Sequence, residues 1–252
     1  MGVALMCAAV VGCRKPGEAK LREGNAAAKA GHLEEAQRAY AEAVNRLPFE
    51  AKPRVLLGNA LFELGRHEEA RAAWTGAVER DAASVEARLG LARLALEAND
   101  AGAALEQLTG PADGVDPALL AQRETLRGLA LLARGASGDA EAALTAAQDA
   151  LTSGPDGPLA LYVRGGALLV LGRYSDAQAA LEQLQVKHPT SPLGPYGLAR
   201  LAAAQGRATD VLLQLQAAKA AAGPAWKADR VAADPAFVFL STSEGFLALV
   251  GK

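Results

Sequence analysis

The stretch GNALFELGRHEEA, residues 58–70, contains the pattern that decides the fold. A small residue, Gly58, stands seven positions before Gly65, and a second small residue, Ala70, follows five positions after it. Glycine readily adopts the left-handed conformation that ends a helix, and small side chains let two helices pack closely. The spacing therefore predicts two short antiparallel helices joined by a tight turn at Gly65.

The same pattern recurs along most of the chain at intervals of 34 to 37 residues. The turn positions are Gly31, Gly65, Asn99, Gly135, Gly172 and Gly206. The small positions seven residues earlier are Gly24, Gly58, Ala92, Gly128, Gly165 and Ala199. Five residues after the turns stand Ala36, Ala70, Ala104, Ala140, Ala177 and Val211. An internal period of this length indicates a stack of similar units rather than one globular core.

The composition agrees with an all-helical chain. Of 252 residues, 60 are Ala, 38 are Leu and none is Ile, so strong helix formers predominate. Hydrophobic residues make up 51% of the chain, which is too apolar for disorder. The 26 basic and 28 acidic residues nearly balance, so the charge gives no sign of a nucleic-acid partner.

The repeats resemble those of the tetratricopeptide repeat (TPR) family. A larger apolar residue follows the second small position by four residues in each unit: Tyr40, Trp74, Leu108, Leu144, Leu181 and Leu215. The resemblance implies an all-α superhelical solenoid of six helix-turn-helix repeats. It places them near residues 17–50, 51–84, 85–118, 121–154, 158–191 and 192–225, and together they span 17–225.

Two segments depart from the regular pattern. Gly110-Pro111 cuts the second helix of the third repeat short, and we expect a local irregularity there. Residues 226–252 fall outside the period and predict one or two capping helices, because a solenoid must cover its last apolar face. Asp234-Pro235 and Ser243 are the expected helix starts. The expected apolar residues of the cap are Trp226, Phe237, Phe239, Phe246 and Leu249.

The N-terminal residues are typical of an export signal. The stretch 2–12 is apolar and uncharged, too short to span a bilayer and of the length of a secretory apolar region. Val10-Val11-Gly12-Cys13 resembles the lipobox of bacterial lipoproteins, which implies a signal peptide over 1–12, an acylated Cys13 and a tether over 13–16. The basic residues expected before such a stretch are missing, which an upstream start codon would explain. Alternatively, residues 2–12 form a buried helix and Cys13 is an ordinary apolar residue.

The residue after Cys13 indicates the membrane to which such a lipoprotein is directed. In Gram-negative lipoproteins, an Asp at that position usually means retention in the inner membrane, and here it is Arg14. The resemblance therefore implies the periplasmic face of the outer membrane, reached through acylated Cys13.

The sequence contains no set of residues that predicts an enzyme. His32 and His67 fall in or beside repeat turns, and His188 precedes Pro189 at a repeat junction. Both cysteines, Cys7 and Cys13, precede the repeats, so we expect neither a metal site nor a cofactor in the folded part. Phosphate-binding loops and zinc-protease motifs are also absent from the sequence.

We instead expect a partner-binding groove on the inner face, which the first helices line in TPR proteins. In the first three repeats this face is polar, with Asn25, Lys29, Lys52, Asn59, Phe62 and Arg93. In the last three it is mostly apolar, with Leu129, Leu132, Tyr162, Leu169, Val170 and Tyr196. The apolar half suits a helix or extended segment of another protein and no small-molecule substrate. In the alternative, tight winding or an inward-folded C-terminal cap buries these side chains.

The groove does not match the known carboxylate clamp of the family. That clamp uses Lys, Asn, Asn, Lys and Arg at positions that here hold Leu21, Asn25, Leu56, Glu86 and Gly90. Glu86 would repel an acidic tail, so we do not expect a chaperone C-terminus as the partner.

A lipid anchor followed by six TPRs is similar to the pilotins, lipoproteins that help an outer-membrane secretin assemble for type IV pili, such as the Tgl-like lipoproteins. The resemblance rests on architecture and size. It implies a protein-protein interaction scaffold or assembly factor whose partner is a client segment or a secretin subunit. Other interpretations remain open: a soluble cytoplasmic TPR adaptor, a periplasmic enzyme, and a peptidoglycan-associated protein.

Overall fold

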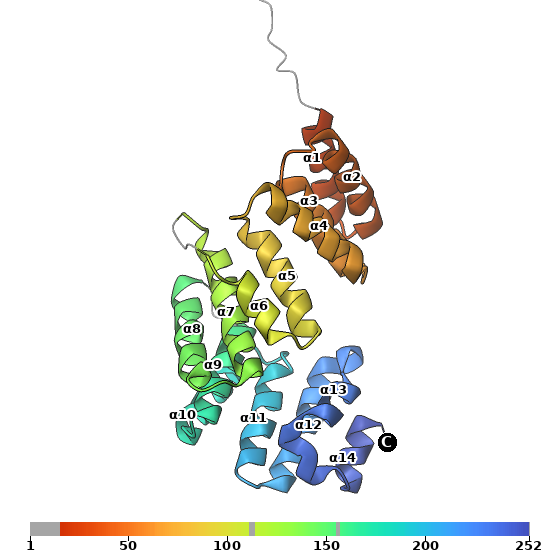
Figure 1. The fold of residues 1–252 in the computed structure, drawn as a ribbon. Coiled ribbons are helices and arrows are strands. Elements are labelled where there is room, and N and C mark those ends of the chain that lie inside the picture. The colour runs from red at the N-terminus through yellow and green to blue at the C-terminus, as the bar shows by residue number, and fades with distance from the viewer. Residues whose placement is uncertain (1–15, 111–113, 155–156, 252) are drawn as a thin grey trace, which may run out of the picture. The chain divides into compact units, whose positions relative to one another are not determined.

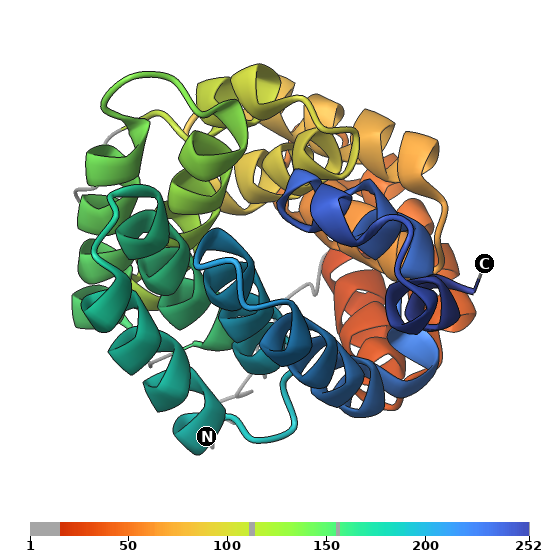
Figure 2. The ribbon, with the colours of Figure 1, turned by 90° about the horizontal axis from the view of Figure 1, so that it is seen from below.

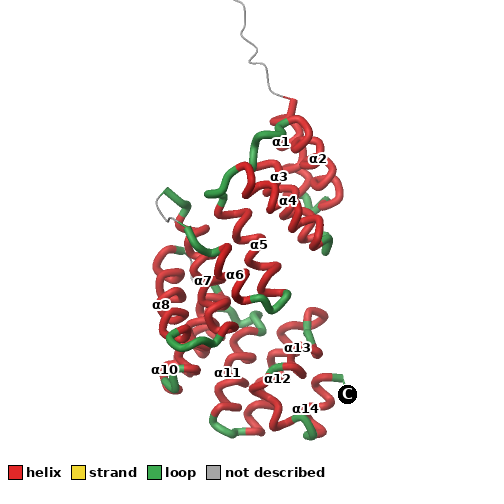
Figure 3. Tube along the Cα trace, in the orientation of Figure 1, coloured by secondary structure: helices red, strands yellow, loops and turns green. Residues whose placement is uncertain are grey.

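The computed structural model describes residues 16–110, 114–154 and 157–251, and all regular elements in these ranges are helices (Figures 1 and 3). The all-α solenoid of paired helices predicted from the repeats is confirmed. The described residues form two compact units, which divide between Leu94 and Ala95. The predicted signal peptide, the alternative helix over 2–12, and the residues Cys13 and Arg14 all lie outside the described residues.

The first unit consists of two helix hairpins and most of a fifth helix. The first hairpin is α1 (Pro16–Lys29) with α2 (Leu33–Arg46), and the second is α3 (Lys52–Glu63) with α4 (His67–Arg80). Helix α5 (Val85–Glu97) continues across the boundary between the units. Glutamates occupy the first turns of α2 and α4, where negative charge stabilises the positive end of the helix dipole.

The second unit continues the alternation of first and second helices up to the cap. Its helices are α6 (Ala101–Gln107), α7 (Pro117–Arg134), α8 (Asp139–Ser153), α9 (Pro158–Val170), α10 (Tyr174–Lys187), α11 (Leu193–Ala204) and α12 (Ala208–Ala222). Helix α6 has only seven residues, which confirms the shortened helix expected before Gly110. Helix α7 starts before the expected repeat boundary at residue 121, because Asp116 accepts a hydrogen bond from the Ala118 amide and Pro117 suits the first helical position.

The turn residues behave as the spacing predicts. Gly31, Gly65, Gly135, Gly172 and Gly206 all have positive φ angles. Asn99 takes the equivalent place in the third repeat with φ of 58°. The left-handed conformation costs least for glycine, and asparagine tolerates it better than most residues, so the turn survives the substitution.

Close packing at the small positions explains why they recur. A Cβ atom added to Gly58 would lie 2.5 Å from Nε1 of Trp74, a side chain that is only 2% exposed. In the second unit, a Cβ at Gly165 would lie 2.6 Å from Cδ2 of Leu181. The small residues of the first helices therefore leave the space into which the larger residues of the second helices insert.

The C-terminal segment packs against the last hairpin as a cap (Figure 2, blue). It consists of η1 (Gly223–Ala225), α13 (Ala228–Ala233), η2 (Pro235–Leu240) and α14 (Glu244–Val250). Their apolar side chains share a core with Val211 and Leu215 of α12. The carbonyl oxygen of Leu249 accepts hydrogen bonds from both Trp226 Nε1 and Lys219 Nζ, each at 3.2 Å.

The cap differs from the sequence expectation in two details. The sequence places Phe239 in the apolar set of the cap, but that side chain is 48% exposed, whereas Phe237 and Leu240 of the same 3₁₀ helix are buried. Ser243 precedes α14 as expected, yet its side chain makes no capping hydrogen bond. Asp234 does cap η2, since its Oδ1 accepts a hydrogen bond from the Ala236 amide at 2.9 Å.

Candidate functional site

On the first helices of the first unit, two predicted groove residues hold aromatic side chains of the second helices. Tyr40 Oη donates a hydrogen bond to Asn25 Oδ1 at 2.9 Å, and Trp74 Nε1 donates one to Asn59 Oδ1 at 3.1 Å. The two bonds are equivalent, because each partner recurs after 34 residues. Burial of the Tyr40 ring raises the pKa of its phenol. Both asparagines therefore have a structural task in addition to any contact with a partner.

The other predicted groove residues of this unit are mainly charged and accessible. Lys29, Lys52 and Arg93 are exposed. Phe62 is half-buried, with its ring centroid 5.1 Å from that of His67 and 5.8 Å from that of Trp74. These residues of the first unit are therefore mostly polar and accessible, with one partly accessible aromatic ring.

In the second unit, two predicted groove residues belong to a polar network that reaches the cap. Tyr196 Oη donates a hydrogen bond to Asp234 Oδ2 at 2.6 Å. Arg200 Nη1 donates to Tyr162 Oη at 3.5 Å, and Arg200 Nε lies 3.5 Å from Asp234 Oδ2. Tyr162 is only 9% exposed. These tyrosines therefore serve internal packing and cannot present their full surfaces to a partner.

Burial and charge set the protonation of this network. Burial raises the pKa of the Tyr196 phenol, and its hydrogen bond to the Asp234 carboxylate raises it further. Burial lowers the pKa of Arg200, but Tyr162 and Asp234 more than offset that effect, so its pKa is raised. Tyr196 is thus a neutral donor and Arg200 a cation at neutral pH, which favours closure of the cap onto α11.

The remaining predicted groove residues are at least partly accessible, and we refer to them as the apolar strip: Leu129, Leu132, Leu169 and Val170. Helices α7 and α9, which carry them, are in contact. The three leucines are half-buried, and Val170 is 65% exposed. Leu132 lies against α9, where a Cβ at Gly166 would come within 3.2 Å of its Cδ1. The strip is the part of the predicted apolar face that remains available.

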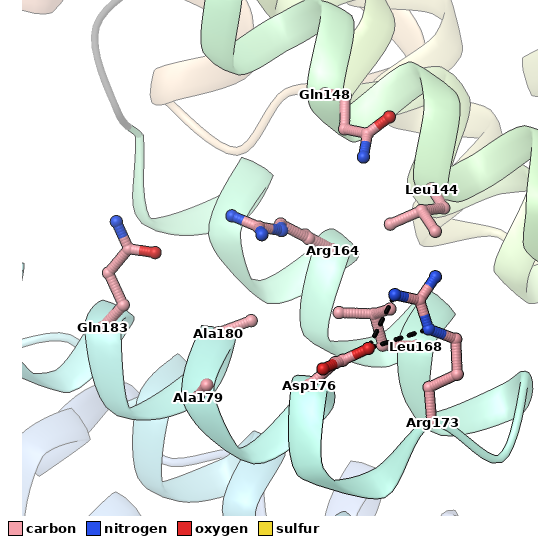
Figure 4. A pocket seen from close by; sticks show the side chains of 9 residues that line it. All are labelled: Leu144, Gln148, Arg164, Leu168, Arg173, Asp176, Ala179, Ala180 and Gln183. Carbon is pink, nitrogen blue, oxygen red and sulfur yellow. Dashed lines mark hydrogen bonds and ion pairs between the residues drawn. The ribbon is translucent and has the colours of Figure 1, made fainter.

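Second helices of this unit also line a pocket that the sequence did not predict. A pocket of about 240 Å³ lies between α8, α9 and α10 (Figure 4). Arg164 of α9 lines it and is the only charged residue of that helix. The sequence signal for this pocket is Arg164, the single charged residue in the stretch PLALYVRGGALLV. The repeat register instead placed the predicted groove on other residues of the first helices.

Neither the histidines nor the acidic residues form a metal site within the described ranges. His32 is exposed in its turn, with Nδ1 3.6 Å from Glu35 Oε2. In those ranges, groups of three or more His, Cys, Asp or Glu side chains able to hold a metal ion do not occur. Membrane-spanning character is also absent there, since the helices are too short or too polar to cross a bilayer.

Several solved structures share the fold. PilW, described as a widely conserved type IV pilus biogenesis factor, aligns with a TM-score of 0.68 and 14% identity over 85% of this chain and 96% of its own. PilF of Pseudomonas aeruginosa aligns with a TM-score of 0.64 and 15% identity, covering 81% and 90% of the two chains. TTC0263, a TPR protein of Thermus thermophilus, gives 0.60 and 25% identity, covering 75% and 99%.

The sequence itself gives the family. No curated protein sequence is similar enough to count as a match. The tetratricopeptide repeat model matches residues 21–74, 55–110, 125–192 and 167–227, which together cover most of the chain. TPR proteins are in general non-enzymatic interaction scaffolds, and the family model that matches is a repeat model rather than a catalytic one. The chain belongs to the tetratricopeptide repeat family.

Proposed function

We propose that this protein is a lipid-anchored TPR scaffold of the outer membrane that binds a segment of another protein during assembly of an envelope complex. The apolar strip on α7 and α9 is the observation that carries the proposal. Half-buried leucines beside an exposed Val170 can bury further apolar area when a helix or extended segment lies on them.

A pilotin-like role is the specific form of the proposal. The client is then a subunit of a type IV pilus secretin, held by the strip until it joins its neighbours. Two proteins of the same fold, PilW and PilF, support this choice, because the first is described as a type IV pilus biogenesis factor. Binding is stoichiometric and needs no cofactor.

The membrane anchor in this proposal is acylated Cys13. Stable attachment requires more than one acyl chain, which a triacylated lipoprotein supplies. The short tether over 13–16 places the first repeat close to the membrane, and Arg14 after the cysteine favours the outer membrane. The support is the lipobox-like Val10-Val11-Gly12-Cys13.

The anchor is tested by replacing the acylated residue. Cys13→Ser is expected to move the protein from the detergent phase to the aqueous phase in a phase-partition assay. The intact mass of the purified wild-type protein should show loss of residues 1–12 and gain of acyl chains. A mass that retains residues 1–12 would instead support the soluble adaptor.

The strip is tested with a double substitution that avoids the buried Tyr162. Leu129→Asp with Val170→Asp should abolish crosslinking to the client in intact cells, measured by mass spectrometry, and reduce secretin multimers on gels. The matched control is Val186→Asp with Leu213→Asp, because these side chains are 81% and 60% exposed on the second helices α10 and α12. Client capture that survives the first pair would exclude the strip, and equal losses in both pairs would show an effect that is not specific to it. Normal secretin multimers in cells lacking the protein would exclude the pilotin role.

A further inference from the structure

The pocket between α8, α9 and α10 is small and polar (Figure 4). Its volume of about 240 Å³ is below the range of about 300–1,000 Å³ typical of small-molecule sites, so it suits one side chain or one chain end. Its polar lining residues are Gln148, Arg164, Arg173, Asp176 and Gln183. The apolar ones include Leu144 and Leu168.

The pocket has one positive charge without an internal counterpart. Arg173 Nε and Nη2 donate hydrogen bonds to Asp176 Oδ2 at 2.9 and 2.6 Å, so these two charges cancel. Arg164 Nε is buried and has no hydrogen-bond partner among the described residues. A buried guanidinium nitrogen without an acceptor is unfavourable, and an anion in the pocket would relieve it.

In the preceding repeat, the arginine equivalent to Arg164 is bonded to a carboxylate of its own helix. Arg127 stands eight residues before the turn at Gly135, as Arg164 stands eight before Gly172. Arg127 Nη1 donates a hydrogen bond to Glu124 Oε2 at 3.2 Å, three residues earlier. The residue three before Arg164 is Leu161, which is 1% exposed. The fourth repeat thus contains its own carboxylate, and the fifth has the arginine without it.

We propose that the pocket binds a carboxylate group of a partner protein, with the Arg164 guanidinium as its main contact. The planar guanidinium matches the two oxygens of a carboxylate, and the amides of Gln148 and Gln183 can add further hydrogen bonds. Leu144 and Leu168 make part of the lining apolar, which strengthens the attraction between the charges. One unpaired positive charge balances a carboxylate but not a doubly charged phosphate. The carboxylate belongs either to a C-terminus or to an Asp or Glu side chain.

This site is separate from the apolar strip. Its lining combines residues of α8 and α10 with Arg164 and Leu168 of α9 and with Arg173, and it does not include any residue of the strip. A carboxylate can bind there whether or not the protein is lipid-anchored, so failure of the pilotin role would leave this proposal intact.

The first test follows Arg164 itself in the full-length protein by NMR. Its Nε–Hε resonance is identified by its loss in Arg164→Lys. Sodium acetate should shift this resonance saturably, whereas sodium chloride at equal ionic strength should not. The Nε–Hε resonance of Arg127 should shift less, because the Arg127 guanidinium is already bonded to Glu124. Absence of an acetate effect, an equal effect of chloride, or stronger binding of inorganic phosphate would overturn the proposal.

The second test distinguishes the two carboxylate sources by fluorescence anisotropy of three labelled peptides. One has a free C-terminal carboxylate, one has the same sequence ending in an amide, and one is amidated with a single internal glutamate. At least one of the two peptides with a carboxylate should bind more tightly than the amidated peptide that has none. The tighter of the two shows whether the pocket prefers a C-terminus or a side-chain carboxylate. Arg164→Gln should weaken that binding about tenfold or more, since a charge-assisted contact is lost.

A matched control removes a positive charge elsewhere. Arg22→Gln changes an exposed residue of α1 and should leave peptide binding unchanged. Equal losses in Arg22→Gln and Arg164→Gln, or equal binding of all three peptides to the wild-type protein, would show nonspecific attraction and refute the pocket.

Discussion

The phenol of Tyr196 on α11 donates a 2.6 Å hydrogen bond to the carboxylate of Asp234, 38 residues later in the chain. The same carboxylate accepts the Ala236 amide through its other oxygen and lies 3.5 Å from Arg200 Nε. The ring of Tyr196 also meets Phe237 edge-on, with centroids 5.8 Å apart. Tyr196 thus joins α11, the first helix of the sixth repeat, to the C-terminal cap.

Removing this hydrogen bond should loosen the cap. Tyr196→Phe keeps the ring but leaves Asp234 without its phenol donor, and hydrogen bonds to charged groups contribute about 1.5–3 kcal/mol. We expect faster amide hydrogen exchange across α14 and a lower free energy of unfolding. Tyr174→Phe is the control, because Tyr174 is 41% exposed at the start of α10. Unchanged exchange in α14 would show that apolar packing alone holds the cap.

Acid should weaken the turn of the fourth repeat. Hydrogen bonds from Arg134, and then from the Ala136 amide, hold the pKa of the buried Asp139 carboxyl below its usual value. A lowered folded-state pKa stabilises the fold above the unfolded value of about 3.9, and this contribution disappears as the pH falls through the folded-state pKa. The stability advantage of wild type over Asp139→Asn, measured by urea unfolding, should therefore shrink below about pH 4.

The control for that series is Asp149→Asn, an exposed carboxylate on the same helix. Its stability should follow that of the wild type over the whole acid range. A difference between wild type and Asp139→Asn that stays constant with pH would contradict the assignment to Asp139.

Adding a methyl group to a close-contact glycine should destabilise the first unit. Gly58→Ala would place a Cβ 2.5 Å from Trp74 Nε1, and overpacking of a filled core costs about 1–3 kcal/mol. Gly102→Ala in α6 meets its nearest atom at 3.5 Å and should gain about 0.5–1 kcal/mol from its better helix propensity. Opposite signs of the two changes in thermal unfolding would verify the packing argument; a gain in both would refute it.

Loss of the Asn59 amide should be visible in tryptophan fluorescence. Asn59→Ala leaves the buried Trp74 indole N–H without its acceptor, at a cost of about 1–3 kcal/mol. The emission of Trp74 should shift, and the first unit should unfold at lower denaturant concentration. Asn45→Ala, an exposed residue of α2, should do neither.

The regular part of the fold could be predicted because each repeat satisfies the same local requirements. Turn residues with positive φ, such as Gly65 and Asn99, mark every hairpin. Small residues mark every close approach, and Gly58 and Gly165 show the contacts that exclude larger side chains. These requirements depend on sequence positions a few residues apart, so periodicity alone reveals them.

The candidate sites were harder to predict because their accessibility depends on which other segments pack against the first helices. Register placed Tyr162 and Tyr196 on the first-helix face, but one is buried and the other is bonded to Asp234 of the cap. The path of the cap follows no period, so the sequence could not place it. Asn25 and Asn59 were recognised as face residues, whereas their bonds to aromatic side chains 15 positions later were not.

The cap described above has a consequence for self-association. An uncovered last hairpin would present apolar side chains such as those of Val211 and Leu215, onto which the leading hairpin of another molecule could stack, and such head-to-tail contacts propagate into open filaments. Phe237, Phe246 and Leu249 occupy that surface instead. By covering this surface, the C-terminal segment removes the apolar face that head-to-tail stacking would require.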